Sequence, residues 1–211
     1  MIVKICGIKR AEELEFVERY ADFTGVVMDR QSKRFVDVER AREIVEVSSI
    51  PVFAVVTSMS FDEACRIADR LNAGHIQIHS ENFPVEDFLR LKDLDFTLAK
   101  AFRIPKKAEN HLDEAKALIE RIRAYNPDFC ILDTGKGSGE VHDIRVSREV
   151  ARKEGIILAG GLNPENVRSV IEFVKPAGVD VSSGVERNGR KNENLVKNFV
   201  RVVKGDKGKS G

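Results

Sequence analysis

Two kinds of hydrophobic pattern alternate along the whole chain. Short apolar runs, typical of buried strands, are each followed by a stretch in which apolar residues recur at helical spacing. We expect strands at residues 2–5, 23–28, 51–56, 75–79, 97–102, 129–132, 156–159 and 179–181. Helices are expected at residues 11–20, 37–47, 60–71, 85–91, 112–125, 146–153, 163–174 and 194–203.

The order of these elements predicts the fold class. Strands that alternate with helices form βαβ units, which build a parallel sheet. Roughly eight such units in 211 residues, with short connections, favour an α/β fold, a (β/α)8 TIM barrel, over a doubly wound sheet. No linker or change of composition divides the chain. We therefore expect one domain over residues 1–203 and a flexible tail, rich in Gly, Lys and Ser, over residues 204–211.

Composition excludes several classes of function. The 35 Lys and Arg residues nearly cancel the 34 Asp and Glu residues, so no excess charge marks the chain for nucleic acid. No apolar run approaches the roughly 20 residues that span a bilayer, and residues 1–5 have the pattern of a strand rather than a leader. Cys6, Cys65 and Cys130 are few, odd in number and without CxxC spacing. We expect a cytoplasmic protein with no disulfide, no zinc site, no membrane contact and no nucleic-acid partner.

The strand at residues 129–132 ends on a carboxylate. Asp133 follows the apolar run directly, and Gly135, Gly137 and Gly139 come soon after it. A carboxylate beside a glycine-rich loop suits a general acid that a closing loop covers. The alternative is that Asp133 only caps a turn, as Asp often does.

Strand parity places a thiol at the end of the first strand. Val3 and Ile5 share one face, and Lys4 and Cys6 share the other. Since the apolar face should meet the helices, Cys6 is expected to point into the barrel at the carboxyl end of its strand, where active residues of this fold lie. Cys6 could act there as a base or a nucleophile. The alternative is an inert buried cysteine.

The fourth strand carries two histidines on the face opposite Ile76 and Ile78. His75 and His79 would lie about 13 Å apart along a strand, and no acidic cluster accompanies them, so we expect no metal site. A polar contact with substrate is expected for His79, and a structural histidine is the alternative.

Two late segments have the composition of phosphate loops. Gly160–Gly161 follows the seventh strand, and Ser182–Ser183–Gly184 follows the eighth. Glycines let the backbone approach an anion, and the loops after strands 7 and 8 form the recurrent phosphate site of this fold. Asp180 shares parity with Ser182 and could also face the mouth of the barrel. Arg34, in the basic loop at residues 29–34, is a candidate for holding a carboxylate, although most loop arginines are simply solvated.

These segments together resemble a known family. The stretches Lys4–Ile5–Cys6–Gly7–Ile8, Ser32–Lys33–Arg34, Ile76–Gln77–Ile78–His79, Leu132–Asp133–Thr134, Leu158–Ala159–Gly160–Gly161–Leu162–Asn163–Pro164–Glu165–Asn166–Val167 and Val179–Asp180–Val181–Ser182–Ser183–Gly184–Val185–Glu186 resemble those of phosphoribosylanthranilate isomerase, an enzyme of tryptophan biosynthesis. The resemblance spans essentially the whole chain.

The resemblance implies an Amadori rearrangement of N-(5-phosphoribosyl)anthranilate to its 1-deoxyribulose 5-phosphate product. It implies that Cys6 is the general base and Asp133 the general acid, and that Arg34 lies against the anthranilate. The glycine and serine loops would hold the phosphate through backbone N–H groups. It further implies a monomer or homodimer that acts on a small phosphoribosyl substrate without a metal or an organic cofactor, because both steps are proton transfers.

Two classes of alternative remain. One is another phosphosugar isomerase or epimerase: histidine-pathway aminoaldose isomerases resemble a pair of aspartates, and Cys6 at the end of the first strand argues against them. A metal-using epimerase would need inward His and Asp ligands on several strands. The other is a catalytically silent protein that binds a phosphoribosyl ligand, against which the presence of both Cys6 and Asp133 argues.

Overall fold

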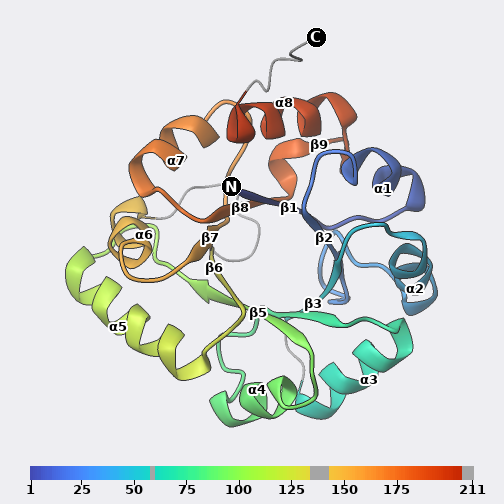
Figure 1. Ribbon diagram of the computed structural model, residues 1–211, viewed down its shortest axis with the longest axis horizontal. Helices are drawn as coiled ribbons and strands as arrows, with labels where there is room; N and C mark the ends of the chain where they lie inside the picture. Colours follow the sequence, from blue (N-terminus) through green and yellow to red (C-terminus); the bar gives the residue numbers. More distant parts are fainter. Residues whose placement is uncertain (58–59, 134–142, 206–211) are drawn as a thin grey trace.

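The computed structural model describes residues 1–57, 60–133 and 143–205. In this part of the chain, parallel strands close into an eight-stranded barrel in chain order, with helices around it (Figure 1). The predicted (β/α)8 barrel is therefore confirmed. Its strands are β1 (Ile2–Cys6), β2 (Phe23–Val27), β3 (Val52–Val56), β4 (His75–Ile78), β5 (Thr97–Arg103), β6 (Phe129–Asp133), β7 (Ile156–Leu158) and β8 (Gly178–Val181).

The helices follow the strands at nearly the expected positions, and local side chains explain their ends. Ser60 begins α3 with a capping box, in which its hydroxyl and the Glu63 carboxylate each accept a backbone N–H. The first helix is shorter than expected, because the amides of Tyr20 and Ala21 both bond to the carbonyl of Val17 in a turn. The helices are α1 (Ala11–Val17), α2 (Val38–Val47), α3 (Phe61–Leu71), α4 (Val85–Lys92), α5 (His111–Tyr125), α6 (Ile144–Ala151), α7 (Val167–Val174) and α8 (Glu193–Lys204).

Three short elements lie between β8 and α8. A 3-10 helix, η1 (Ser183–Val185), leads into a two-stranded antiparallel hairpin of β9 (Glu186–Arg187) and β10 (Arg190–Lys191). The hairpin was not expected from the sequence. At the carboxyl end of the chain, α8 runs through Lys204, and residues 206–211 of the expected tail lie outside the described residues.

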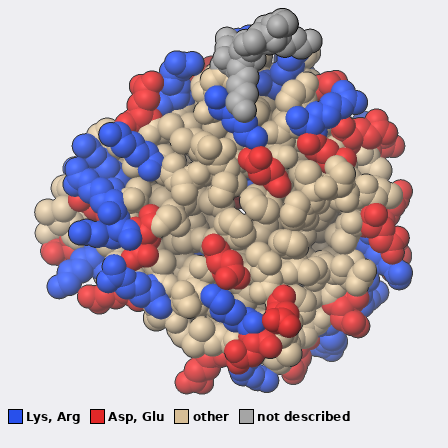
Figure 2. All heavy atoms as spheres, viewed as in Figure 1, with Lys and Arg blue, Asp and Glu red and all other residues tan. Residues whose placement is uncertain are grey.

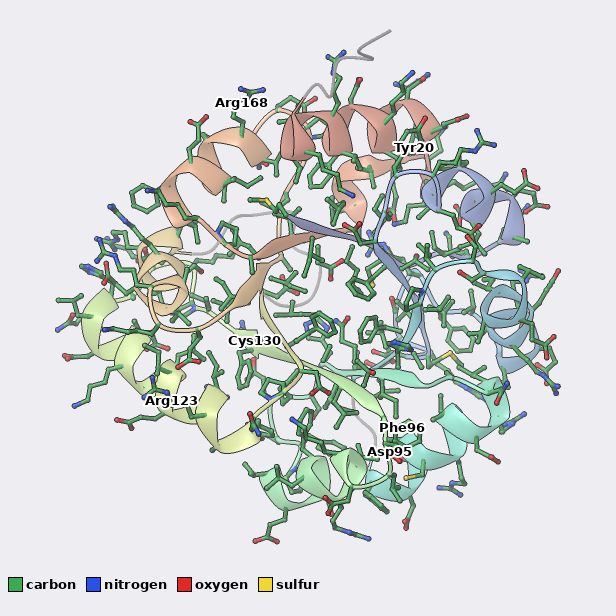
Figure 3. The ribbon with its side chains drawn as sticks, in the orientation of Figure 1. Tyr20, Asp95, Phe96, Arg123, Cys130 and Arg168 are labelled. Atoms are coloured by element: carbon green, nitrogen blue, oxygen red, sulfur yellow. The ribbon has the colours of Figure 1, made fainter. Side chains whose placement is uncertain are left out.

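Alternation along the strands separates two apolar cores. One side of each strand packs against the helices, and the other fills the space that the barrel encloses (Figure 3). Aromatic rings of Phe23, Phe53 and Phe129 meet edge to face inside the barrel, with centroids 5.1–5.8 Å apart. Cys6 packs against this inner cluster, as strand parity predicts.

A fully buried lysine lies between the barrel and the helices. Lys100, on the helix-facing side of β5, donates to the carbonyls of Ser80 (2.8 Å) and Ala101 (2.9 Å). Its ammonium lies 5.0 Å from the ring centroids of both Phe102 and Tyr125. Burial lowers the pKa of Lys100 to about 8. Lys100 therefore links Ser80, the residue after His79, to the neighbouring strand β5.

On the face seen in Figures 1 and 2, charged side chains lie mainly around the circumference, over the helices, and the centre is mostly uncharged. Lys and Arg side chains gather on the side of α5 and α6. Of the helices that the structure describes, none is both long and apolar enough to cross a membrane.

Candidate active site

The carboxyl ends of four strands bring together four polar candidates, three selected by strand parity and Asp133 selected by its position at the end of a strand. Cys6 ends β1, His79 follows β4, Asp133 ends β6 and Asp180 lies in β8. Strand pairing places Lys4 directly beside Asp180, because β1 and β8 close the barrel in that register. The inward faces of these strands therefore converge on one end of the barrel, where this fold carries its chemistry.

A buried ion pair lies below the mouth of the barrel. Lys4 Nζ donates to Asp180 Oδ2 over 3.1 Å, and the two side chains are only 1% and 7% exposed. Asp180 Oδ1 is buried and has no hydrogen-bond partner among the described residues. Burial raises the pKa of Asp180, and Lys4 opposes this rise. The site thus contains an acceptor oxygen that a bound hydroxyl could satisfy, since orphaned buried acceptors are rare.

The groups around Cys6 have opposing effects on the pKa of its thiol. Burial raises the pKa of Cys6, and the nearby ammonium of Lys4 is the largest opposing influence, through charge and a hydrogen bond. Asp180 raises the thiol pKa and Lys191 lowers it. The pKa stays above its ordinary value, so Cys6 rests as a neutral thiol near pH 7 with cations placed to stabilise its thiolate.

The expected acid has a histidine partner. His79 Nε2 lies 3.2 Å from Asp133 Oδ2, and both side chains are partly exposed at the mouth. Sequence reasoning selected both residues but not their contact, which joins β4 to β6. The glycine-rich loop at residues 135–139, expected to cover Asp133, lies outside the described residues.

The two glycine loops touch each other. A Cβ on Gly184 would lie 1.9 Å from the carbonyl oxygen of Leu162, so only glycine fits at this contact. Gly160 and Gly161 both have positive φ, 86° and 64°, in the loop after β7. The loops therefore form one continuous stretch of backbone at the end of the barrel.

Helix α7 begins later than the expected residue 163. Asn163 accepts the amides of Glu165 and Asn166, and Asn166 accepts the amide of Asn163. Asn166 also donates to the carbonyl of Gly161. These side-chain bonds compete with helical ones, so residues 163–166 form a turn that holds the glycine loop in place.

Arg34 lies beside the loop that follows β8. Its Nε and Nη2 donate to Glu186 Oε1 and Oε2, over 2.7 and 3.0 Å. Lys191 Nζ also donates to Glu186, over 2.7 Å, and to Ser182 Oγ, over 3.1 Å. The Ser182 hydroxyl in turn donates to the carbonyl of Cys6. These contacts link the ends of β1 and β8 with the loop after β2.

Sequence reasoning missed three residues of this site. Lys4 was placed on the same face as Cys6 without a role, and Glu186 and Lys191 were not candidates. The signal for the last two was available: Asn188–Gly189 is the strongest short-range sign of a hairpin, and it places Lys191 opposite Glu186. Over the described residues, no group of three His, Cys, Asp or Glu side chains could hold a metal ion.

A known protein family matches nearly the whole chain. The family model for N-(5'phosphoribosyl)anthranilate (PRA) isomerase matches residues 3–202. This chain belongs to the phosphoribosylanthranilate isomerase family. An N-(5'-phosphoribosyl)anthranilate isomerase from Pyrococcus furiosus is 52% identical over 204 residues, which cover 97% of this chain and 98% of the relative.

Solved structures of phosphoribosylanthranilate isomerases share the whole fold. That of the Pyrococcus furiosus enzyme has a TM-score of 0.90 and 49% identity, over 97% of this chain and 98% of its own. A phosphoribosylanthranilate isomerase in complex with reduced 1-(o-carboxyphenylamino)-1-deoxyribulose 5-phosphate has a TM-score of 0.78 and 33% identity, over 97% of this chain and all of its own. Monomers generated from the dimeric Thermotoga maritima enzyme match with a TM-score of 0.81 and 32% identity, over 97% and 100% of the two chains.

Proposed function

We propose that this chain isomerises N-(5-phosphoribosyl)anthranilate to 1-(2-carboxyphenylamino)-1-deoxyribulose 5-phosphate, a step of tryptophan biosynthesis. The observation that carries the proposal is that Cys6 and Asp133 end strands on the same rim of a barrel whose family match spans residues 3–202. The binding of a reduced product analogue by a related isomerase supports the same substrate class.

Asp133 acts as the general acid. It protonates the ring oxygen of the ribose, so that the ring opens to a Schiff base between C1 and the anthranilate nitrogen. His79, with Nε2 3.2 Å from Asp133 Oδ2, keeps the carboxyl group oriented toward the mouth of the barrel. The partial exposure of both side chains lets the acid recover its proton from solvent between turnovers.

Cys6 acts as the general base. It removes the proton from C2 of the opened ribose, and the resulting enolamine tautomerises to the ketone. The form that reacts is the thiolate, which Lys4 and Lys191 stabilise and which is the minor form at rest. The positive charge on the Schiff base lowers the barrier to this step, so this fraction of thiolate suffices. Lys4, which lies between Cys6 and Asp180, stabilises the thiolate that burial alone would disfavour.

Substrate binding uses the rest of the rim. Asp180 Oδ1 accepts a ribose hydroxyl, which satisfies its missing hydrogen bond. Arg34 contacts the anthranilate. Backbone N–H groups of Gly160, Gly161, Ser182, Ser183 and Gly184 hold the phosphate. The hydroxyl of Ser182 already donates to the backbone carbonyl of Cys6. We therefore assign the amide of Ser182, rather than its hydroxyl, to the phosphate. No metal or organic cofactor takes part in these two proton transfers.

Replacement of the base tests the proposal against a silent binding protein. We expect Cys6→Ser to lower kcat by about 10²- to 10⁴-fold, the usual contribution of a general base, while the affinity for the reduced product analogue stays within a few-fold. Calorimetric titration of the analogue and steady-state kinetics give the two quantities. An unchanged kcat would remove Cys6 as the base, and a wild-type chain that binds the analogue without turnover would be a binding protein.

A further inference from the structure

The β9–β10 hairpin is an addition to the barrel with a defined geometry of its own. Asn188 and Gly189 both have positive φ, 53° and 71°, as a two-residue type I′ turn requires. This turn sets Lys191 opposite Glu186 in the antiparallel register. The hairpin lies between α8 and α1 (Figure 1), and the amide of Lys191 donates to Glu13 of α1 over 2.9 Å. It is therefore fixed to the rest of the molecule.

All three ammonium donors of Lys191 are used inside the protein. Nζ bonds to the carbonyl of Ser182 (3.2 Å), the hydroxyl of Ser182 (3.1 Å) and the carboxylate of Glu186 (2.7 Å), and the side chain is 0% exposed. A buried ammonium is tolerated only when its donors are bonded in this way. Lys191 therefore has no donor left for a ligand, and its place is behind the loop that follows β8.

Glu186 holds Arg34 by one edge. The carboxylate accepts from Nε and Nη2 in a bidentate pair, the arrangement that orients a guanidinium most strictly. The stem of Arg34 rests on Gly7, where a Cβ would lie 2.5 Å from Arg34 Cδ and where φ is +81°. The guanidinium is thus held at its edge and along its stem, and the described residues make no hydrogen bond to Nη1.

The three charged groups leave one net positive charge. Arg34 and Lys191 are cations, and Glu186 neutralises one of them. An anionic carboxylate and phosphate on the same substrate would both gain from this surplus. Because Lys191 bonds to Ser182 and Glu186 bonds to Arg34, one connected network spans the proposed phosphate loop and the proposed anthranilate contact.

We propose that the hairpin is a positioning element, in which the Glu186–Lys191 pair orients the Arg34 guanidinium for the anthranilate and anchors it to the loop that follows β8. This inference rests on the proposed function, since it assigns a partner to the anthranilate contact. Glu186 and Lys191 themselves touch no substrate. Their effect passes through Arg34 and the backbone of Ser182.

A double-mutant cycle tests the proposal. Glu186→Gln keeps the size of the side chain but loses its charge, and Arg34→Met keeps a stem over Gly7 but loses the guanidinium. We expect Glu186→Gln to lower kcat/KM about tenfold, mainly through a higher KM, and to lower it less than about twofold further in the Arg34→Met background. Arg187→Gln, on the exposed side of the same hairpin, is the matched control and should leave both constants unchanged.

The same double-mutant cycle is repeated with the dissociation constant of the reduced product analogue as the measured quantity. Because this measurement needs no turnover, it tests the positioning role separately from the proposed isomerase activity. If the wild-type chain binds the analogue without turnover, the proposed function fails, and non-additive affinities still support the positioning role. Equal losses in both backgrounds would overturn that role, as would a loss confined to kcat. A wild-type chain that neither turns over the substrate nor binds the analogue would overturn both proposals. Thermal unfolding of each variant shows whether it is folded.

Discussion

The contact between the two glycine loops makes Gly184→Ala a sharp perturbation. A Cβ there would lie 1.9 Å from the carbonyl oxygen of Leu162 and 2.9 Å from Cα of Asn163. Both neighbours are backbone atoms, so no side-chain rotation relieves the overlap. Ordinary contact begins near 3.4 Å, so the loops must separate by about 1.5 Å. Overpacking of this kind costs about 1–3 kcal/mol of stability.

The same displacement sets the expected loss of function. A misplacement of about 1 Å can cost on the order of 10²-fold in rate, and here the groups displaced are the amides proposed to hold the phosphate. We expect kcat/KM to fall by about 100-fold or more, and the inhibition constant of inorganic phosphate to rise by at least about tenfold. Steady-state kinetics with phosphate as a competitive inhibitor measures both quantities.

Gly155→Ala is the matched control for Gly184→Ala. A Cβ at Gly155, between α6 and β7, would meet no atom within 4 Å. We expect this variant to keep the wild-type melting temperature, kcat/KM and phosphate inhibition. A Gly184→Ala protein with the same melting temperature and the same inhibition by phosphate as the wild type would refute the reasoning, because the loops would then not abut as described.

Two further predictions follow from buried lysines. In Lys4→Met, the pH profile of Cys6 alkylation by iodoacetamide, measured by peptide mass spectrometry from pH 7 to 10, should shift to higher pH, because Lys4 lowers the thiol pKa more than Asp180 raises it. An unchanged profile would exclude Lys4 as the stabilising cation. Lys153→Met, on the surface, serves as control. For Lys100, whose pKa is about 8 when folded and 10.5 when unfolded, the unfolded state binds more protons between these values, so stability rises with pH there. The excess unfolding free energy of wild type over Lys100→Met should therefore grow from pH 8 to 10.5 in urea titrations, and a constant difference would contradict this.

The fold and most of the candidate site residues follow from local patterns. Short continuous apolar runs mark the strands, and the alternation of side chains along them points Cys6, His79 and Asp180 to one end of the barrel. These properties depend only on residues close in sequence and on the closure of parallel strands. Asp133 was found from a different local signal, its position at the end of a strand and before a glycine-rich stretch.

The remaining features depend on side-chain contacts that the hydrophobic pattern does not show. Arg34 and Glu186 are 152 positions apart, and nothing local to either one indicates the pairing. Lys100 lies in a buried strand because two backbone carbonyls and two rings surround it, which no periodicity reveals. The start of α7 was placed too early because Pro164 suits the first turn of a helix, whereas the side chain of Asn163 holds residues 163–166 in a turn.

Turnover of freshly generated phosphoribosylanthranilate, with metals chelated throughout, tests the central claim most directly. We expect the anthranilate fluorescence to fall at a rate proportional to the wild-type protein, and Asp133→Asn, which preserves shape, to lower that rate by about 10²- to 10⁴-fold while it still binds the reduced product analogue. Wild-type turnover that Asp133→Asn leaves intact would contradict the assignment of the acid. No turnover by the wild-type protein would contradict the proposed isomerase activity itself.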